Sequence, residues 1–181
     1  MKENRFYETK ALNTLSNEVA IIKPKNIKEL KIIVKEYSTY YPDYTLNWLD
    51  VSEITDMSNL FAGDKVKHKY CMYNGDISKW DVSNVKNMSE MFSYSKFNQD
   101  ISEWDVSGVQ NMYCMFCNSV FNKDISDWDV SNVKNISGMF YNSKFTQDIS
   151  YWTINIRDKK NYVKVFDNCP IEEDNKPYLR E

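Results

Sequence analysis

Three stretches of the chain read almost alike: DISKWDVSNVKNMSEMF at residues 76–92, DISEWDVSGVQNMYCMF at 100–116 and DISDWDVSNVKNISGMF at 124–140. A degraded copy begins as DISYW at 148–152, and an early variant, WLDVSEITDMSNLF, occupies 48–61. The tryptophans of the later copies recur every 24 residues, at Trp80, Trp104, Trp128 and Trp152. A fixed period of this length is typical of repeat proteins in which successive copies stack. We therefore predict one structural repeat, or rung, per copy.

Within one copy, two local patterns indicate secondary structure. Val85, Met88, Met91 and Phe92 have the spacing of one face of a single α- or 3₁₀-helical turn. Residues 99–104 form a short, partly apolar run suited to a brief strand. Each copy thus predicts a strand, a turn, a helical turn and a loop. Because one copy is too short to enclose a core, stacked copies must bury a shared one.

Residues that stay constant between copies are explained by this stacking. We expect rings at equivalent positions to form ladders through the core: the four repeat tryptophans, then Phe92, Phe116 and Phe140, and then Phe97, Phe121 and Phe145. Repeated polar residues should serve turns, because Asn and Asp side chains bond the backbone nearby. These are Asn87, Asn111 and Asn135 beside a bend, and Asp81, Asp105 and Asp129, with Ser83, Ser107 and Ser131, as caps of the helical turn.

The two ends of the chain differ from the repeats. Residues 1–47 are predicted to form an N-terminal cap, with a strand over 19–22 and an amphipathic helix over 26–37 that begins at Asn26. Residues 48–169 hold the repeats, and 170–181 form a charged tail that we expect to be mobile.

The string DISxWDVSNVxNMxxMF resembles the repeat of the BspA-like leucine-rich repeat family, found in bacterial surface proteins and first catalogued in mycoplasmas as a domain of unknown function. KPKNIKELK at 23–31 and the early copy at 48–61 also look like the cap that precedes these repeats in some members, so the resemblance covers 23–169. It implies a right-handed solenoid with one short strand per rung, and binding or adhesion without catalysis. The expected fold class is therefore an α/β repeat solenoid, leucine-rich-repeat-like, of about five 24-residue rungs with an N-terminal helical cap.

Several classes of function are disfavoured by composition and motifs. The net charge of −3 does not favour general attraction to nucleic acid or anionic membrane. Residues 1–10 lack an apolar signal-peptide core, and no apolar run could span a bilayer, so we expect a cytoplasmic protein, with the extracellular surface as the alternative. Cys114 and Cys117 form a C-x-x-C pair without a second pair, which favours reduced thiols over zinc or redox chemistry. With a single histidine and no phosphate-binding glycine motif, we expect no enzyme, cofactor or metal site.

Two groups of residues are candidates for binding a partner. The early copy carries an insertion over 63–74, a basic and aromatic loop of the kind that often binds. Its candidates are Lys65, Lys67, His68, Lys69, Tyr70 and Tyr73. The second group surrounds the tryptophans, on the expected strand face, at positions that vary between copies or repeat an aspartate: Lys79, Gln99, Asp100, Glu103, Lys123, Asp124, Asp127, Gln147, Asp148 and Tyr151. The row Asp76, Asp100, Asp124 and Asp148 would either attract a cation or basic partner, or accept backbone N–H bonds in its own turns.

These observations favour a non-catalytic protein–protein interaction module that uses the strand face, the 63–74 loop, or both. A small intracellular inhibitor or decoy is the sharper form of this hypothesis. The alternatives are a short member or fragment of a surface adhesin family, and nucleic-acid binding through residues 65–73.

Overall fold

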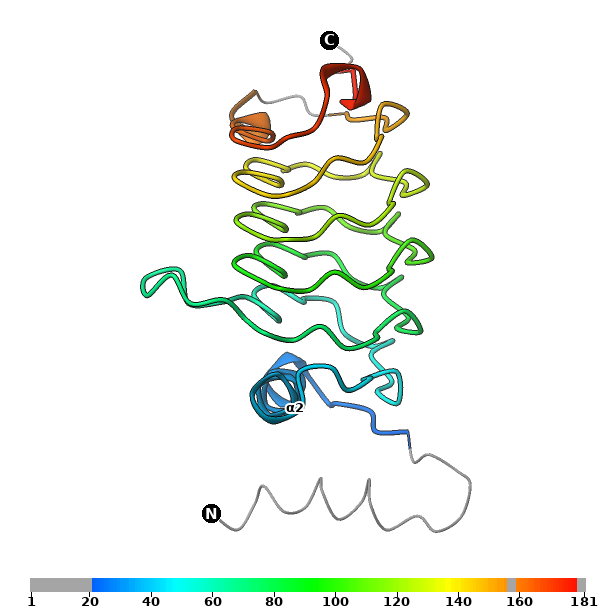
Figure 1. Cartoon of the computed structure of the whole chain (residues 1–181). Coiled ribbons are helices and arrows are strands. Elements are labelled where there is room, and N and C mark those ends of the chain that lie inside the picture. Colours follow the sequence, from blue (N-terminus) through cyan, green and yellow to red (C-terminus); the bar gives the residue numbers. More distant parts are fainter. Residues whose placement is uncertain (1–20, 156–158, 179–181) are drawn as a thin grey trace.

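A computed structural model describes residues 21–155 and 159–178. Figure 1 shows these residues as a stack of similar coils, with one helix, α2 (Ile27–Tyr40), across the N-terminal end and two short 3₁₀ helices, η1 (Lys159–Tyr162) and η2 (Glu173–Asn175), near the C-terminal end. Helix α2 begins after Asn26, whose side chain accepts hydrogen bonds from the N–H groups of Lys28 and Glu29. Its buried side chains, Leu30, Ile33 and Val34, belong to the common core.

The predicted strand in each coil is wrong. Nowhere in the described ranges does the chain form a strand or sheet; neighbouring coils share only isolated bridges, such as Asn87 with Asn111 and Asn111 with Asn135. The segment 99–104, expected to be extended, contains a turn closed by Trp104 N–H on the Ile101 carbonyl at 3.2 Å. Aspartate and serine side chains satisfy the backbone locally here, which competes with pairing between strands. The fold is therefore not an α/β solenoid with one strand per rung.

The predicted helical turn is wrong as well. Around Met88 and Phe92 the chain makes successive turns, in which Met91 N–H bonds the Met88 carbonyl at 3.2 Å and Ser93 N–H bonds the Glu90 carbonyl at 3.1 Å. Glu90 has φ of 54°, a left-handed conformation that a right-handed helix cannot contain. The apolar spacing of the sequence is also met by these turns, so periodicity alone could not separate them from a helix.

Backbone hydrogen bonds join neighbouring coils in both directions: Gln110 N–H donates back to Lys86 C=O at 2.9 Å, whereas the turn region donates forward. In this turn region, Met88 N–H donates to Asn111 C=O at 2.8 Å, and Phe92 N–H donates to Met115 C=O at 2.9 Å, with the same pattern repeated in the next coil. The intervening peptides bond within their own turns. This arrangement satisfies most of the backbone without a continuous β ladder.

The aromatic ladders predicted from the repeats are confirmed. Trp80 and Trp104 stack with ring centroids 6.5 Å apart, and Phe92 and Phe116 stack at 5.6 Å. Each repeat indole also donates its Nε1–H to a carbonyl of the preceding coil, as Trp104 does to Ile77 at 3.2 Å. The rings therefore join neighbouring coils by apolar contact and by hydrogen bonds together.

The described part of the C-terminal tail is packed, although the sequence predicted a mobile tail. The strand predicted over 19–22 lies partly outside the described residues, and Ile22 makes an isolated bridge to Leu49. In the tail expected to be mobile, Ile171 and Pro177 are buried, and Ile149 N–H donates to Asn175 C=O at 3.0 Å. The described part of the tail, which includes η2, thus packs on the last coil; residues 179–181 are outside the description.

The polar turn residues act as predicted, although they close turns and cap no helix. Asn111 Oδ1 accepts from Tyr113 N–H at 3.0 Å, Asp105 Oδ1 accepts from Ser107 N–H at 3.0 Å, and Asp100 Oδ1 accepts from Ser102 N–H at 2.9 Å. The same contacts recur in the other complete copies. The repeated aspartates therefore accept backbone N–H bonds in their own turns, which is one of the two roles expected for them.

These turns predict a loss of stability in acid. The pKa is lowered chiefly by the serine hydroxyl in Asp50, Asp105 and Asp129, and chiefly by the serine N–H in Asp100 and Asp148. Since the unfolded chain binds these protons at higher pH than the folded one, the stabilisation is complete above about pH 4 and is lost as pH falls through the lower folded values. Urea unfolding at stepwise pH should show this loss. A variant with all five changed to Asn, which still accepts the N–H bonds, should show a weaker dependence; an unchanged slope would contradict the prediction.

Candidate functional site

The inserted loop projects from the stack as a narrow arm, which we define as residues 64–69 (Figure 1). Asp64 and Lys69 pair across its base through two backbone hydrogen bonds of 2.7 and 2.9 Å. Exposed Lys65, Lys67 and His68 lie between them. Lys67 pairs with Asp64 at 3.7 Å and Lys65 with Glu90 at 3.1 Å, so part of the positive charge of the arm is neutralised.

The remaining two candidates of the insertion, Tyr70 and Tyr73, differ in how deeply they are buried. Tyr70 is partly buried, its ring lies 6.1 Å from that of Tyr94, and Lys96 Nζ lies 4.3 Å over its face. Tyr73 is 0% exposed, stacks on Phe61 at 4.7 Å and donates its hydroxyl hydrogen to the Tyr44 carbonyl at 3.1 Å. Burial raises the pKa of Tyr73. Its selection as a partner-binding residue is therefore corrected: Tyr73 belongs to the core.

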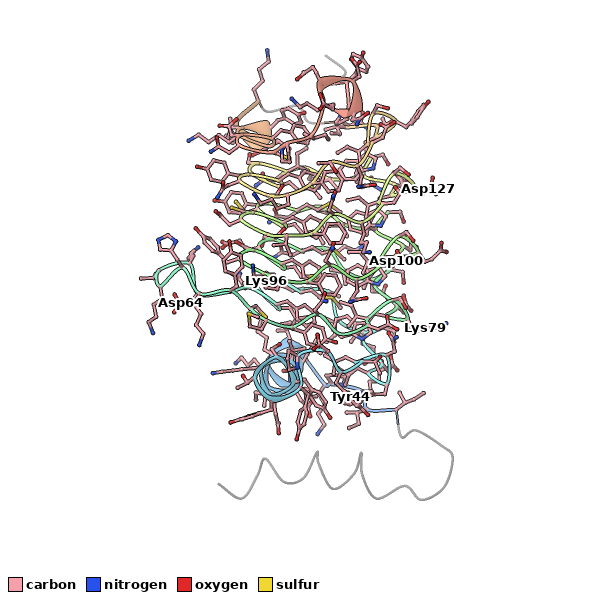
Figure 2. All side chains as sticks on the ribbon, in the orientation of Figure 1. Tyr44, Asp64, Lys79, Lys96, Asp100 and Asp127 are labelled. Atoms are coloured by element: carbon pink, nitrogen blue, oxygen red, sulfur yellow. The ribbon has the colours of Figure 1, made fainter. Side chains whose placement is uncertain are left out.

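The second predicted group lies on the opposite side of the stack from the arm. In Figure 2, Lys79, Asp100 and Asp127 mark this edge, which we call the corner, while Asp64 marks the arm. The corner is built from turns, which replace the predicted strand face, and it carries Lys79, Gln99, Asp100, Glu103, Lys123, Asp124, Asp127, Gln147, Asp148 and Tyr151. The structure thus gathers these ten residues along one edge but does not bring them to the arm.

A shallow, acidic hollow of about 400 Å³ lies within the corner. Asp124, Asp127 and Asp148 line it, with Gln147 and the 86% exposed Tyr151. Asp124 and Asp148 each accept the N–H group of the serine two residues later, at 2.9 Å, so their carboxylates are held by their own turns. The hollow is therefore a by-product of repeated turn geometry with little that is specific to it.

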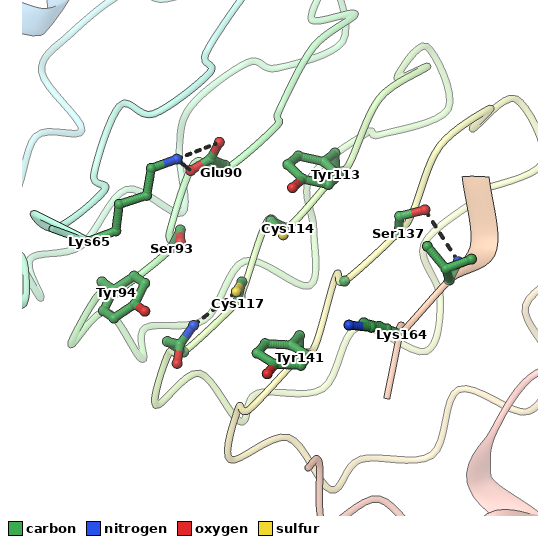
Figure 3. A pocket seen from close by; sticks show the side chains of 13 residues that line it. Lys65, Glu90, Ser93, Tyr94, Tyr113, Cys114, Cys117, Ser137, Tyr141 and Lys164 are labelled. Carbon is green, nitrogen blue, oxygen red and sulfur yellow. Dashed lines mark hydrogen bonds and ion pairs between the residues drawn. The ribbon is translucent and has the colours of Figure 1, made fainter. Parts of the chain in front are cut away.

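A larger groove, of about 460 Å³, lies on a third surface that the sequence did not lead us to select. Figure 3 shows its lining: Lys65, Glu90, Ser93, Tyr94, Tyr113, Cys114, Cys117, Asn118, Ser137, Gly138, Tyr141, Val163 and Lys164. These side chains come from the turn segments of successive coils. Lys65 belongs to both the arm and the groove, so the two features form one continuous surface.

The groove arises where the copies differ most from one another. Four residues occupy equivalent positions in successive coils: Glu90, Cys114, Gly138 and Lys164. The N–H group of each of the first three donates to the carbonyl just before the next one in the series, and all four have φ between 50° and 64°. A Cβ added at Gly138 would lie 2.8 Å from Cys114 Sγ. The missing side chain at Gly138 therefore opens the hollow above Cys114, between the larger Tyr113 and Tyr141.

Tyr113 and Tyr141 have no aromatic counterparts at the equivalent positions of the other two clear copies. The signal that identifies the groove is the variation at three positions: Ser89, Tyr113 and Ser137; Glu90, Cys114 and Gly138; and Ser93, Cys117 and Tyr141. The predicted helical turn hid this signal, because it gave no reason for these positions to share a surface.

The polar groups of the groove are partly paired. Lys65 and Glu90 form its ion pair, and Asn118 Nδ2 lies 3.0 Å from Cys117 Sγ. The pKa of Tyr113 is raised, chiefly by its hydrogen bond to Cys114. No cluster of three or more His, Cys, Asp or Glu side chains in the described ranges could hold a metal ion. Over the same residues, every helix falls short of the length and apolarity needed to cross a membrane.

The fold and this surface define a protein of stacked 24-residue coils with a helix at its N-terminal end, an inserted arm and a tyrosine-lined groove. The model of a family described as "Mycoplasma protein of unknown function, DUF285" matches residues 3–96, 28–152 and 68–176. The chain belongs to this family. No curated protein and no solved structure matches it.

Proposed function

We propose that the chain is a non-catalytic protein-binding module that holds a segment of one partner protein against the arm and the groove. One observation carries this proposal: in the groove, side chains that vary between otherwise similar coils line a concave surface that also contains exposed aromatic rings. Positions that the repeat needs are constant and buried, such as Met91, Met115 and Met139. Variation on a concave surface, beside a constant core, is expected when that surface is selected for contact and the core is selected for stacking.

The groove has the composition of a protein-binding surface. Tyrosines dominate it, and tyrosine supplies a large, rigid and amphipathic contact area at low entropic cost. Tyr113 is 41% exposed, and its hydroxyl oxygen can accept a hydrogen bond from a partner. Lys164 lies at one end of the groove and Lys65 of the arm lies at the other (Figure 3). A partner segment with apolar or aromatic side chains flanked by acidic residues would complement this arrangement.

The resemblance to BspA-like leucine-rich repeats supports the same class of function, since that family implies binding or adhesion. The arm occurs in one coil only, and the groove beside it is lined by side chains that differ from coil to coil. This location favours a single specific contact over a repetitive adhesive surface.

A capture experiment with matched variants tests this proposal. The tagged chain is compared, in lysate of the native host, with a groove variant carrying Tyr113→Ala and Tyr141→Ala and with a corner variant carrying Glu103→Ala and Tyr151→Ala. The corner variant removes a similar number of exposed atoms on the opposite side. Because buried anchor residues each contribute about 1–2 kcal/mol or more, the groove variant should recover at least about tenfold less partner, measured by quantitative mass spectrometry.

Circular dichroism should first show that both variants fold as the native chain does. A partner that is lost with the corner variant and kept by the groove variant would overturn the assignment of the surface. A partner lost after nuclease treatment of the lysate would indicate binding through nucleic acid, which also contradicts the proposal.

A further inference from the structure

Two of the four cysteines meet in the groove, at the two ends of one turn. Cys117 N–H donates to the Cys114 carbonyl at 3.1 Å, which closes a β-turn from Cys114 to Cys117. A β-turn holds the Cα atoms of its first and fourth residues within about 7 Å, which overlaps the range of about 4.4–6.8 Å found across disulfides. Both side chains line the groove, neither is in a disulfide, and Figure 3 shows the sulfurs on the same wall.

Hydrogen-bond donors converge on one of these two sulfurs. Asn118 Nδ2 lies 3.0 Å from Cys117 Sγ, and the Ser93 hydroxyl and the Cys114 thiol also donate to it. Together they lower the pKa of Cys117 to about 7, with the Cys114 thiol as the largest cause and burial acting against it. The pKa of Cys114 is raised, chiefly because its proton is held in this hydrogen bond. Cys117 is thus the nucleophile of the pair and Cys114 holds the shared proton.

The pair serves no purpose in the repeat itself. The positions equivalent to Cys114 hold Glu90, Gly138 and Lys164, and those equivalent to Cys117 include Ser93 and Tyr141. A thiol at either position is therefore dispensable for stacking. With small side chains on both sides, at Ser93 and Gly138, both thiols lie in the wall of the groove, where Cys114 is partly exposed and Cys117 is 8% exposed.

The other two cysteines have structural roles. Cys169 replaces the serine found at the same position in other coils, and its thiol donates to the Phe145 carbonyl at 3.3 Å. Cys71 is partly buried, and burial raises its pKa. Only the groove pair therefore combines two neighbouring thiols with a sulfur whose pKa is lowered.

We propose that Cys114 and Cys117 form a thiol–disulfide exchange site whose substrate is a low-molecular-weight disulfide. The Cys117 thiolate attacks one sulfur of that disulfide, and the second sulfur leaves as a thiolate. The Cys114 thiol then gives its proton to the departing thiolate. The resulting Cys114 thiolate attacks Cys117 Sγ, which closes the intramolecular disulfide and releases the second thiol. In balance, the two cysteines are oxidised, the external disulfide is reduced to two thiols, and the two cysteine protons end on the products.

The consequence for the groove is a local change in its floor. Closing the bond joins residues that already share a turn, so the coils need not separate. It replaces two polarisable thiols and their hydrogen bonds with one apolar bridge beneath Tyr113 and Tyr141. This inference stands on the geometry of the turn alone, whether or not the groove holds a protein partner.

The test uses glutathione disulfide as the probe and the full chain carrying Cys71→Ser and Cys169→Ser, so that only the groove thiols remain. Samples are quenched with acid and measured by intact mass. We expect this chain to lose two hydrogen atoms without keeping glutathione. With Cys114→Ser added, one glutathione should stay attached to Cys117, because no second thiol can release it.

With Cys117→Ser added in place of Cys114→Ser, the remaining Cys114 should react about fivefold more slowly at pH 7. A pKa near 7 in place of an ordinary cysteine value of about 8.5–9 raises the thiolate fraction by roughly 20- to 50-fold, and lower intrinsic nucleophilicity removes most of that gain. In the Cys114→Ser chain the introduced hydroxyl can donate to Cys117 in place of the thiol, so its rate should rise with pH and level off at lower pH than that of the Cys117→Ser chain. Equal rates for the two single-thiol chains, or a native pair that retains glutathione and forms no intramolecular bond, would overturn the proposal.

Discussion

Replacing Phe116 with alanine should lower the free energy of unfolding by about 3–5 kcal/mol. Phe116 is 0% exposed and lies at the middle of a ladder, with ring centroids 5.6 Å from Phe92, 4.2 Å from Phe121 and 5.7 Å from Phe140. Removing it loses contacts in three coils at once. Repeated rings fix the spacing between coils, so their neighbours cannot close the cavity without shifting the hydrogen bonds that join the turns.

Urea unfolding, followed in parallel by tryptophan fluorescence and far-ultraviolet circular dichroism, measures this loss. Tyr151→Ala is the matched control: the ring is of similar size but 86% exposed, and its removal should change the stability by less than about 0.5 kcal/mol. A Phe116→Ala chain as stable as this control would show that the ladder does not hold the coils together.

Replacing Gly75 with glutamine should lower the stability by about 1–3 kcal/mol, although the repeat itself suggests the opposite. Gly75 occupies the position that holds Gln99, Lys123 and Gln147 in the later copies, so a consensus argument would treat glutamine there as harmless. In the structure, a Cβ at Gly75 would overlap the backbone of Tyr44 and lie 2.7 Å from the Tyr73 hydroxyl oxygen. The segment that connects α2 to the first coil occupies this space.

Two hydrogen bonds hold the segment there. Asn74 N–H donates to the Pro42 carbonyl at 2.7 Å, and Leu46 N–H donates to the Asp76 carbonyl at 3.0 Å. Displacing it should also make residues 41–45 more sensitive to limited proteolysis. Lys123→Gln, the corresponding change in a later coil, should affect neither stability nor cleavage. A Gly75→Gln chain indistinguishable from Lys123→Gln would contradict the placement of α2 against the first coil.

The predicted binding residues illustrate what can be inferred from one sequence. The arm residues Lys65, Lys67 and His68 are exposed as expected, since a polar insertion within a repeat has nowhere to go but outward. Tyr73 was misjudged because it lies near the end of this insertion in the sequence, yet it already belongs to the buried core. The groove was missed because it joins residues 24 apart, or close to multiples of 24, whose common surface depends on the shape of the turn.

The sequence by itself determined the period of the stack, the aromatic ladders, the polar residues that close the turns and the cap of α2. All of these depend on which residues recur, and recurrence can be read directly. Only the tertiary structure decided that the coils are built from turns, without strands or helical turns, because residues such as Glu90 and Cys114 adopt left-handed conformations that apolar spacing does not reveal. It also decided where the groove lies, since Gly138 leaves space above Cys114 only when neighbouring coils are held in register by their backbone hydrogen bonds.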